Sequence, residues 1–593
     1  MKKNFHYLYA TLAVVCIFFT ASCKKNILDK KSLDQIIEED VWTDPSLVNA
    51  FVNSRYNQIG HGWYSESWVS SMCDESFLTW SRSTEPITQG YVSPSFIGSM
   101  NGGHWGENLR RWDVVWRNIG NCNIFFDNVN KVPFPELNLK NRLIGEVTFI
   151  RALMYWDLVN RWGAMPLITK SYGIDNVGEI SKLKRNTYKE NIDFLVAECD
   201  KAAAALPPGF TGTNKGRATS VAALALKSRV LLYAASPLMS NARSDDPNFF
   251  VHYQTPDAAR WQKAADAAQA AITAALANGY ALFDKYGADV KKNYTGIFME
   301  GGNSEVIFDR QGGTSASSTN LGYIDEANGP NGYGAWGGNT PTAEFVDDFQ
   351  MSDGTKFSWN NPVHKANPYA NRDARLYATV LSDGDMWKGR KVETFYFKKP
   401  DGSETGGLDT KYGSNSWNTS ATGYNARKFL DETEVQGSWN FNPKNWIWFR
   451  LGELYLNLAE AKFFAADEAG ARTALNVIRD RARMPRVTAS GTQLWEAIVY
   501  ERRVELAFEE HRYFDVRRWM IADVVLNKNA TGITIVREGT APPYTYTYSP
   551  GTSTALPRLV EVRKFVAPKM YWLPIQLDEM NKNPNLGQNP GYN

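Results

Sequence analysis

The sequence predicts a mainly α-helical protein, in which tetratricopeptide-like helix pairs form a superhelical scaffold with long loop-rich insertions and a few short β-strands. Helix-length segments follow one another, with apolar residues at three- and four-residue intervals, and proline or glycine ends each of them. One pair of segments has tetratricopeptide spacing. The stretches between the pairs are rich in glycine, serine and aromatic residues, which is typical of loops that carry function.

The N-terminal half contains the clearest helical segments. Apolar periodicity predicts helices at residues 142–161, 188–206, 218–235 and 261–277. The first is followed by Gly163, and prolines follow the second and the third. Because segments of similar length come in successive pairs, we expect a helical repeat array.

The C-terminal half contains the pair that matches a known repeat. The W-x2-L-G-x2-Y spacing of a tetratricopeptide first helix is present at Trp448, Leu451, Gly452 and Tyr455. A second helix is expected at residues 468–483, where Pro485 ends it. Near the end of the chain, residues 542–550 and 559–567 alternate as strands do, and they are candidates to pair with each other.

Residues 500–519 form the most heavily charged segment. An apolar stripe at three- and four-residue spacing predicts a helix here. Glu509 precedes Arg512 by three residues, a spacing that stabilises a helix surface by roughly 0.2–0.5 kcal/mol per ion pair. Asp515 precedes Arg518 by the same interval. We interpret the segment as a charged amphipathic helix whose Glu and Arg side chains hold the scaffold together.

Residues 1–22 have the features of a bacterial lipoprotein signal peptide. Two lysines precede an apolar run that is too short for a membrane span, which needs about 20 apolar residues. Small residues then lead to Cys23, although Thr20 stands where such sites usually carry an aliphatic residue. We expect lipidation of Cys23 and a lipid-anchored tether at residues 23–45, so that only the N-terminal lipid enters the membrane. A secreted protein with a chance cysteine is the alternative.

Charge and cysteine content exclude several classes of protein. The chain has 593 residues and a net charge of +2, so no strong field favours nucleic acid. Without Cys16 and Cys23, the cysteines are Cys73, Cys122 and Cys199, which lack the spacing of a zinc site. We expect them to be buried small hydrophobic residues, with one disulfide as an open alternative.

Motifs for catalysis are missing from the sequence. It contains no phosphate loop, dinucleotide fingerprint, HExxH or G-x-S-x-G, and its six histidines are scattered. A metal or catalytic site at His511 and Asp515 is the alternative to the charged helix, but two ligands do not make a site. We therefore predict no enzyme activity, no metal site and no cofactor. Calcium bound by carboxylates far apart in the sequence stays an open alternative.

Six blocks in sequence order carry a family resemblance. They are residues 149–169, 217–237, 450–461, 474–485, 501–519 and 573–592. With the lipoprotein signal, they span almost the entire chain. The chain resembles the SusD/RagB outer-membrane lipoproteins of Bacteroidetes-type bacteria.

The resemblance implies a function that the composition does not show. It implies a lipid anchor at the outer face of the outer membrane and a SusC-like TonB-dependent transporter as partner. It also implies binding of an oligosaccharide or polysaccharide for uptake, without catalysis. A peptide-binding lid of an oligopeptide importer is the main alternative, and a surface hydrolase is a weaker one. On this basis residues 46–300 are the N-terminal SusD-like helical region and residues 301–593 the C-terminal SusD/RagB region.

Candidate ligand residues follow from loop position and chemistry, because no family motif assigns them. Sugars present an apolar C–H face and a hydroxyl rim, which suit a flat aromatic ring and a polar neighbour. Glycines around Tyr333 and Trp336 predict that both rings project freely; the alternative for every candidate is a ring tucked onto the scaffold. The predicted ligand-binding residues are Trp80, Tyr91, Asn101, Trp105, Tyr323, Tyr333 and Trp336.

Overall fold

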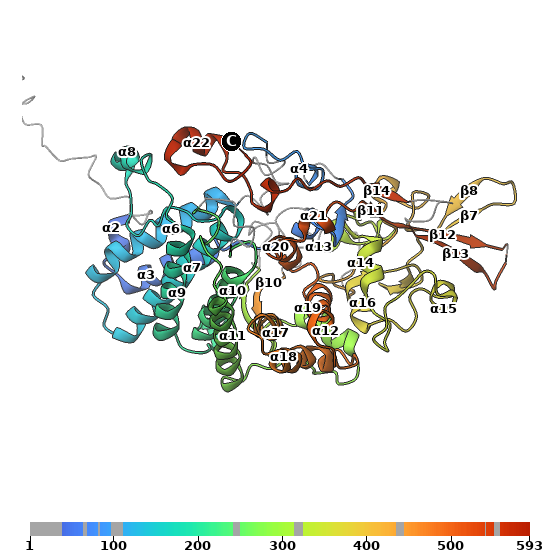
Figure 1. The fold of residues 1–593 in the computed structure, drawn as a ribbon, viewed down its shortest axis with the longest axis horizontal. Helices are drawn as coiled ribbons and strands as arrows, with labels where there is room; N and C mark the ends of the chain where they lie inside the picture. The colour runs from blue at the N-terminus through green and yellow to red at the C-terminus, as the bar shows by residue number, and fades with distance from the viewer. Residues whose placement is uncertain are drawn as a thin grey trace, which may run out of the picture.

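The fold is mainly helical, as predicted, with the four-stranded sheet at one end (Figure 1). The computed structural model describes residues 38–62, 68–80, 84–96, 111–240, 249–312, 324–433, 444–539, 541–550 and 558–592. The predicted signal peptide and Cys23 lie outside these ranges. Within them, none of the helices combines the length and apolar character that a membrane span requires.

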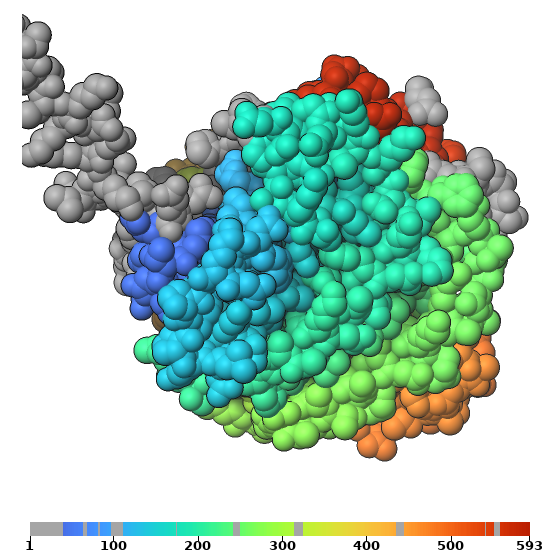
Figure 2. All heavy atoms as spheres, turned by 90° about the vertical axis from the view of Figure 1, so that its left-hand side faces the viewer, coloured from blue at the N-terminus to red at the C-terminus, as the bar shows by residue number. Residues whose placement is uncertain are grey.

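The N-terminal half folds into a row of helices packed in chain order. These are α2 (Glu38–Val41), α3 (Pro45–Tyr56), α6 (Trp112–Asn128), α7 (Leu137–Trp162), α9 (Tyr188–Ala205), α10 (Ser220–Ala235) and α11 (Ala259–Ala277). In this row, α7 packs against α9, α9 packs against α10, and α10 packs against α11. Figure 2 shows this end of the molecule, where the colours run from blue to green across the face in sequence order.

Local signals explain where these helices begin. The predicted start of the second helix is confirmed at Tyr188, because Thr187 and Glu190 form a capping box. Thr219 caps α10 by accepting a hydrogen bond from the Ala222 amide at 3.1 Å. The helix predicted at residues 142–161 is longer than expected and begins at Leu137. Its periodicity is weak over the first turns, which explains the late predicted start.

The C-terminal helices continue the scaffold. They are α17 (Leu451–Phe464), α18 (Glu468–Arg481), α19 (Gly491–Glu505), α20 (His511–Arg518), α21 (Ala522–Val525) and α22 (Leu577–Lys582). The pair α17–α18 packs together, and α17 also packs on α11. One detail of the repeat prediction is wrong: Trp448 lies in strand β10 (Trp446–Arg450), which pairs with β2 (Val306–Arg310). Its indole Nε1 donates to the Gly60 carbonyl at 2.9 Å, so it anchors a loop instead of opening the helix.

The largest sheet lies at the opposite end of the molecule from α3 and α7 (Figure 1). Its order is β13 (Thr545–Pro550), β12 (Ile533–Glu538), β7 (Tyr396–Lys398) and β8 (Glu404–Gly406). The predicted pairing of residues 542–550 with 559–567 is wrong. Strand β13 instead forms a hairpin with β12, and β14 (Leu559–Glu561) pairs with β11 (Ala530–Thr531). Alternation of side chains marks a strand but does not say which strand pairs with it.

Further short elements complete the fold. They are α4 (Glu85–Thr88), α8 (Val177–Ile180), α12 (Val290–Met299), α13 (Ile324–Asn328), α14 (Ala343–Asp348), α15 (Pro362–Ala366) and α16 (Ala374–Thr379). The short strands are β1 (Ser76–Leu78), β3 (Asn339–Pro341), β4 (Val380–Leu381), β5 (Met386–Trp387), β6 (Arg390–Lys391) and β9 (Asn425–Ala426). Among the described residues, Cys73, Cys122 and Cys199 are buried free thiols, so the disulfide alternative is not formed.

The charged segment at residues 500–519 is not one surface helix. It is split between α19 and α20, because Phe508 and Glu510 adopt left-handed backbone conformations at φ 63° and 66°. The predicted surface pairing of Glu509 with Arg512 is also wrong, since Glu509 is buried and pairs with Arg450 at 2.8 Å. The pairing of Asp515 with Arg518 is confirmed at 2.8 Å, but both side chains are buried.

The buried charges form a network at the centre of the molecule. The Arg450 guanidinium lies 2.8 Å from Glu305, 2.7 Å from Glu505 and 2.8 Å from Glu509. Arg375 reaches Glu505 at 2.9 Å from the other side. Such a network is favourable only when every charge has partners, because each ion has given up its hydration. The prediction that these Glu and Arg residues hold the scaffold together is thus consistent with their contacts, which link the residue before β2 with β10, α16 and α19.

Candidate ligand-binding surface

Two of the predicted aromatic residues meet in the structure. Strand β1 pairs with β3 in antiparallel register, with Leu78 opposite Asn339. This pairing carries Trp80, just after β1, next to Trp336, just before β3. The two rings are 5.9 Å apart between centroids and inclined at 70°. Two loops far apart in the sequence therefore contribute one aromatic pair.

Hydrogen bonds hold the ring of Trp80 and the backbone of Trp336. The Trp80 indole Nε1 donates to the Asn418 side-chain oxygen at 3.3 Å. The Trp336 backbone amide donates to the Glu326 carbonyl at 2.7 Å. Gly338 lies so close to the Trp80 ring that an added Cβ would stand 3.2 Å from it, so this glycine serves close packing. Both rings are partly exposed and held in place before any ligand arrives.

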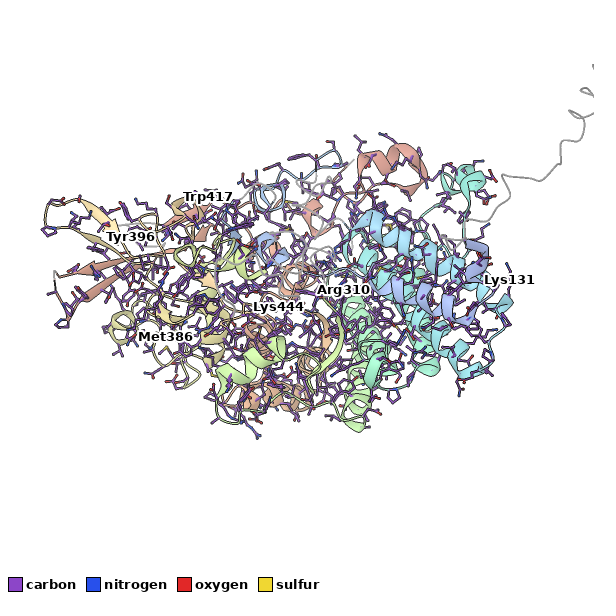
Figure 3. All side chains as sticks on the ribbon, turned by 180° about the vertical axis from the view of Figure 1, so that it is seen from behind. Lys131, Arg310, Met386, Tyr396, Trp417 and Lys444 are labelled. Carbon is purple, nitrogen blue, oxygen red and sulfur yellow. The ribbon has the colours of Figure 1, made fainter. Side chains whose placement is uncertain are left out.

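A third tryptophan, which is not among the predicted residues, lies beside this pair. Trp417 lies in the short turn η9 (Ser416–Asn418), next to the Asn418 that receives the Trp80 hydrogen bond, and it is 72% exposed. Figure 3 labels its side chain near the sheet end of the molecule. The signal in the sequence was a tryptophan among serine and asparagine residues, the same composition that singled out the other loops. Trp417 gives this surface its most accessible ring.

The prediction that Tyr333 projects freely is wrong. Its ring is only 5% exposed, and its hydroxyl donates to the carbonyls of Trp387 at 2.7 Å and Arg390 at 3.0 Å. The Arg390 guanidinium stacks 3.7 Å from the ring centroid, and burial raises the pKa of Tyr333 to about 12. The neighbouring Gly332 does not free the Tyr333 ring. It allows close packing instead, because the Leu408 carbonyl occupies the space that a Cβ would need. Tyr333 is therefore part of the scaffold beneath the tryptophan pair.

Of the remaining predicted residues, the structure describes Tyr91, whose ring stacks on a different partner. Tyr91 is 46% exposed and stacks on Phe96, with centroids 6.0 Å apart and rings nearly parallel. Its loop contacts the start of α22, where the Leu577 amide donates to the Pro94 carbonyl at 2.9 Å. The predicted contacts Asn101, Trp105 and Tyr323 lie outside the described residues.

A cleft with a volume of about 1010 Å³ lies elsewhere, between α9, α10 and α11. Its floor is aliphatic, with Val196 and Leu231, and its walls carry charged side chains such as Asp193 and Lys263. Phe249 at its edge is 52% exposed. The cleft is therefore lined by charged side chains, whereas the tryptophan surface presents flat aromatic rings.

The described residues contain little that resembles a catalytic or metal centre. They hold no group of three or more His, Cys, Asp or Glu side chains placed to bind a metal ion. Asp515 is taken up by Arg502 at 3.2 Å and by Arg518 at 2.8 Å. Burial and neighbouring arginines lower the pKa of His511 well below its usual range, so this imidazole is neutral. The alternative metal site at His511 and Asp515 thus has no support in these contacts.

Comparison with known proteins gives two family matches and a consistent fold. Residues 304–592 match the SusD family, and residues 27–232 match a family described as starch-binding and associating with the outer membrane. A SusD-like protein of Formosa agariphila is 24% identical over 70% of this chain and 71% of its own length.

Solved structures agree with these matches. A SusD-like protein of Bacteroides fragilis is 27% identical, covers 95% of this chain and 100% of its own, and superposes with a TM-score of 0.74. A SusD-like carbohydrate-binding protein of the same species has 23% identity, coverage of 92% and 99%, and a TM-score of 0.71. The two family matches span most of the chain in order. The chain therefore belongs to the SusD/RagB family.

Proposed function

We propose that this protein is a cell-surface lipoprotein that binds an oligosaccharide or polysaccharide at Trp80, Trp336 and Trp417 and delivers it to a SusC-like TonB-dependent transporter. The observation that carries the proposal is the tryptophan pair from two distant loops, oriented by the Asn418 side chain and left accessible. The family is one of carbohydrate-binding proteins, which supports a glycan as the ligand class.

The chemistry of the surface favours a sugar. An indole ring covers the C–H face of a pyranose, and polar groups at its rim satisfy the hydroxyls. Asn418 is buried and its amide already bonds Trp80, so its main contribution is to hold the ring. Because the rings are fixed before binding, little conformational entropy is lost when the ligand arrives. No step in this role needs catalysis.

The anchor and the partner rest on the sequence and the family. The predicted lipid on Cys23 would hold the protein to the outer membrane through the part of the predicted 23–45 tether that precedes α2. The family description places its members in association with the outer membrane. An outward-facing lid on a nutrient transporter is the arrangement that fits a binding protein without an enzyme site.

The test is a panel of ligands. Purified protein without its signal peptide is run in native gels containing amylopectin, laminarin, xylan or a casein peptide digest. We expect retardation by at least one polysaccharide and none by peptides. Retardation by peptides alone would replace the glycan proposal with the peptide-lid alternative. Shortening of a retained polysaccharide during incubation would favour the hydrolase instead.

A further inference from the structure

Residues 407–418 form a single loop, here named the bridge loop, which joins the tryptophan pair to the four-stranded sheet. At one end, Asn418 accepts the hydrogen bond of Trp80. At the other end, the Gly407 amide donates to the Phe395 carbonyl at 2.9 Å, beside strand β7. In between, Asn331 donates to the carbonyls of Thr410 at 3.1 Å and Ser414 at 2.8 Å.

A buried ion pair holds the bridge loop rigid. Asp409 is buried, and its two oxygens accept hydrogen bonds from Arg390 at 2.8 and 2.9 Å. The Glu393 amide donates to the same carboxylate at 2.8 Å. A loop bonded at both ends and in the middle presents its exposed side chains in fixed positions, which lowers the entropy cost of binding.

The middle of the bridge loop builds an exposed aromatic corner with strand β7. The rings of Tyr396 on β7 and Tyr412 on the loop are 6.1 Å apart and nearly perpendicular, at 78°. The Lys411 ammonium stands 5.8 Å from the first centroid and 5.0 Å from the second. Tyr412 donates its hydroxyl proton to Glu404 at 2.8 Å, and Lys411 pairs with the same carboxylate at 3.3 Å.

These side chains are accessible although they are ordered. Tyr412 is 42% exposed, and more than half of the Lys411 and Glu404 side chains is exposed. Trp417 lies on the same loop, between the corner and the tryptophan pair, and Figure 3 shows Trp417 and Tyr396 at the same end of the molecule. Aromatic rings thus occur in the middle of one rigid loop, at Tyr412, and near its Asn418 end, at Trp417.

The chemistry of the corner suits a hydroxylated ligand. The two rings offer flat apolar surface to C–H groups, Glu404 accepts hydrogen bonds from hydroxyls, and Lys411 donates to oxygen atoms. One carboxylate balances one ammonium, so the corner favours a neutral sugar over an anionic one. An apolar protein surface would leave both charges without their hydration, which makes protein docking unfavourable here.

We propose that the Tyr396–Tyr412 corner is a second sugar-binding subsite, and that it engages a separate segment of the same polysaccharide chain that the tryptophan pair holds. This inference rests on the proposed function, since it needs a glycan at the first site. Two subsites on one rigid surface raise the affinity for long chains by making the second contact intramolecular. Chains too short to span both subsites gain nothing from the corner.

The test compares chain lengths. Calorimetry measures the affinity of wild type and Tyr412→Ala for amylopectin, laminarin and xylan, and for maltotriose, laminaritriose and xylotriose. We expect the affinity of Tyr412→Ala for the bound polymer to fall roughly tenfold or more, as expected when an avidity gain of about 10²–10⁴ is lost in part. Its affinity for the matching trisaccharide is expected to equal that of wild type.

Two control variants separate the effect of losing the Tyr412 ring from an effect on the fold. Tyr412→Phe keeps the ring and loses only the bond to Glu404, so we expect it to retain most of the polymer affinity. Tyr546→Ala removes a partly exposed ring from the opposite face of the same sheet, where Tyr546 packs on Phe395 at 5.8 Å, and should change nothing. An equal loss for polymer and trisaccharide in Tyr412→Ala, or no loss for either, overturns the second subsite.

The two proposals fail in different ways. If Trp336→Ala leaves the trisaccharide affinity unchanged while Tyr412→Ala weakens the polymer, the first site is misplaced and the corner stands. If wild type binds none of the three polymers, the proposed function falls and the second subsite falls with it. If Trp336→Ala weakens both ligands and Tyr412→Ala weakens neither, only the second subsite is overturned.

Discussion

At the residue scale, two neighbouring acids just before β1 have opposite electrostatic environments. Burial alone would raise the pKa of Asp74, but the paired Arg503 and Arg512 hold it well below the usual range. Burial raises the pKa of Glu75 to about 8. The Phe508 amide donates to one oxygen of Glu75 at 3.4 Å, and no described residue donates to the other. Glu75 is therefore protonated and neutral near pH 7.

A neutral buried carboxyl makes stability depend on pH in a defined direction. The pKa of Glu75 is raised in the folded state. Its contribution to the free energy of unfolding is therefore fully present below its ordinary pKa and is lost as pH rises towards 8. We predict that Glu75→Gln, which mimics the protonated form, gains roughly 1 kcal/mol of unfolding free energy per pH unit over wild type between pH 5 and pH 8. Urea titrations at pH 5, 6.5 and 8 measure it. Parallel pH profiles for the two proteins would contradict the buried neutral carboxyl.

Single residues also mark where sequence reasoning stops. Tyr333 and Trp336 lie in one glycine-rich stretch and have the same local signal, yet one ring is buried and the other is partly exposed. The difference comes from Arg390, which stacks on Tyr333 from a distant segment. Composition locates an aromatic residue on a loop, but a tertiary contact decides whether its ring faces solvent.

At the element scale, helices follow from periodicity more reliably than strand partners do. The helices α9 and α10 begin within two residues of their predicted starts, since capping residues mark them. The strands β13 and β14 were recognised, but their partners β12 and β11 were not, because alternation says nothing about which neighbour lies beside a strand. The break between α19 and α20 was missed, since nothing local shows that Phe508 and Glu510 have positive φ.

The buried ion network supplies a prediction at this scale. Arg450 has three carboxylate partners, so replacing it with methionine leaves Glu305, Glu505 and Glu509 with unbalanced buried charge. We predict that Arg450→Met lowers the unfolding free energy by about 3–5 kcal/mol. Chemical denaturation followed by circular dichroism measures it.

An exposed ion pair gives the matched control. Lys189 and Asp193 lie 2.5 Å apart on α9, and both side chains are more than half exposed. Lys189→Ala is expected to change the unfolding free energy by less than about 0.5 kcal/mol. Similar small losses in Arg450→Met and Lys189→Ala would mean that the central network does not hold the scaffold together.

At the scale of the whole molecule, the binding surface and the anchor are separate parts. The tryptophan surface is built from loops of both halves of the chain, since β1 and β3 pair across them. The predicted lipid anchor depends on Cys23 alone. We predict that Cys23→Ala abolishes palmitate labelling in the native host and releases the protein from the outer-membrane fraction. Cys122→Ala, which changes a buried free thiol, should leave both unchanged. Membrane retention of Cys23→Ala would contradict the lipid anchor.

The central claim is that the paired tryptophans hold a glycan, and calorimetry on single variants tests it most directly. Wild type, Trp80→Ala, Trp336→Ala and Phe249→Ala are titrated with the trisaccharide of the polymer that wild type retains. Phe249 is an exposed ring on the distant cleft and serves as the control. We predict that each tryptophan variant loses roughly ten- to a hundredfold in affinity, about 1.4–2.8 kcal/mol, at unchanged thermal stability, and that Phe249→Ala binds as wild type does. Unchanged affinity in both tryptophan variants, or a loss confined to Phe249→Ala, would contradict the claim.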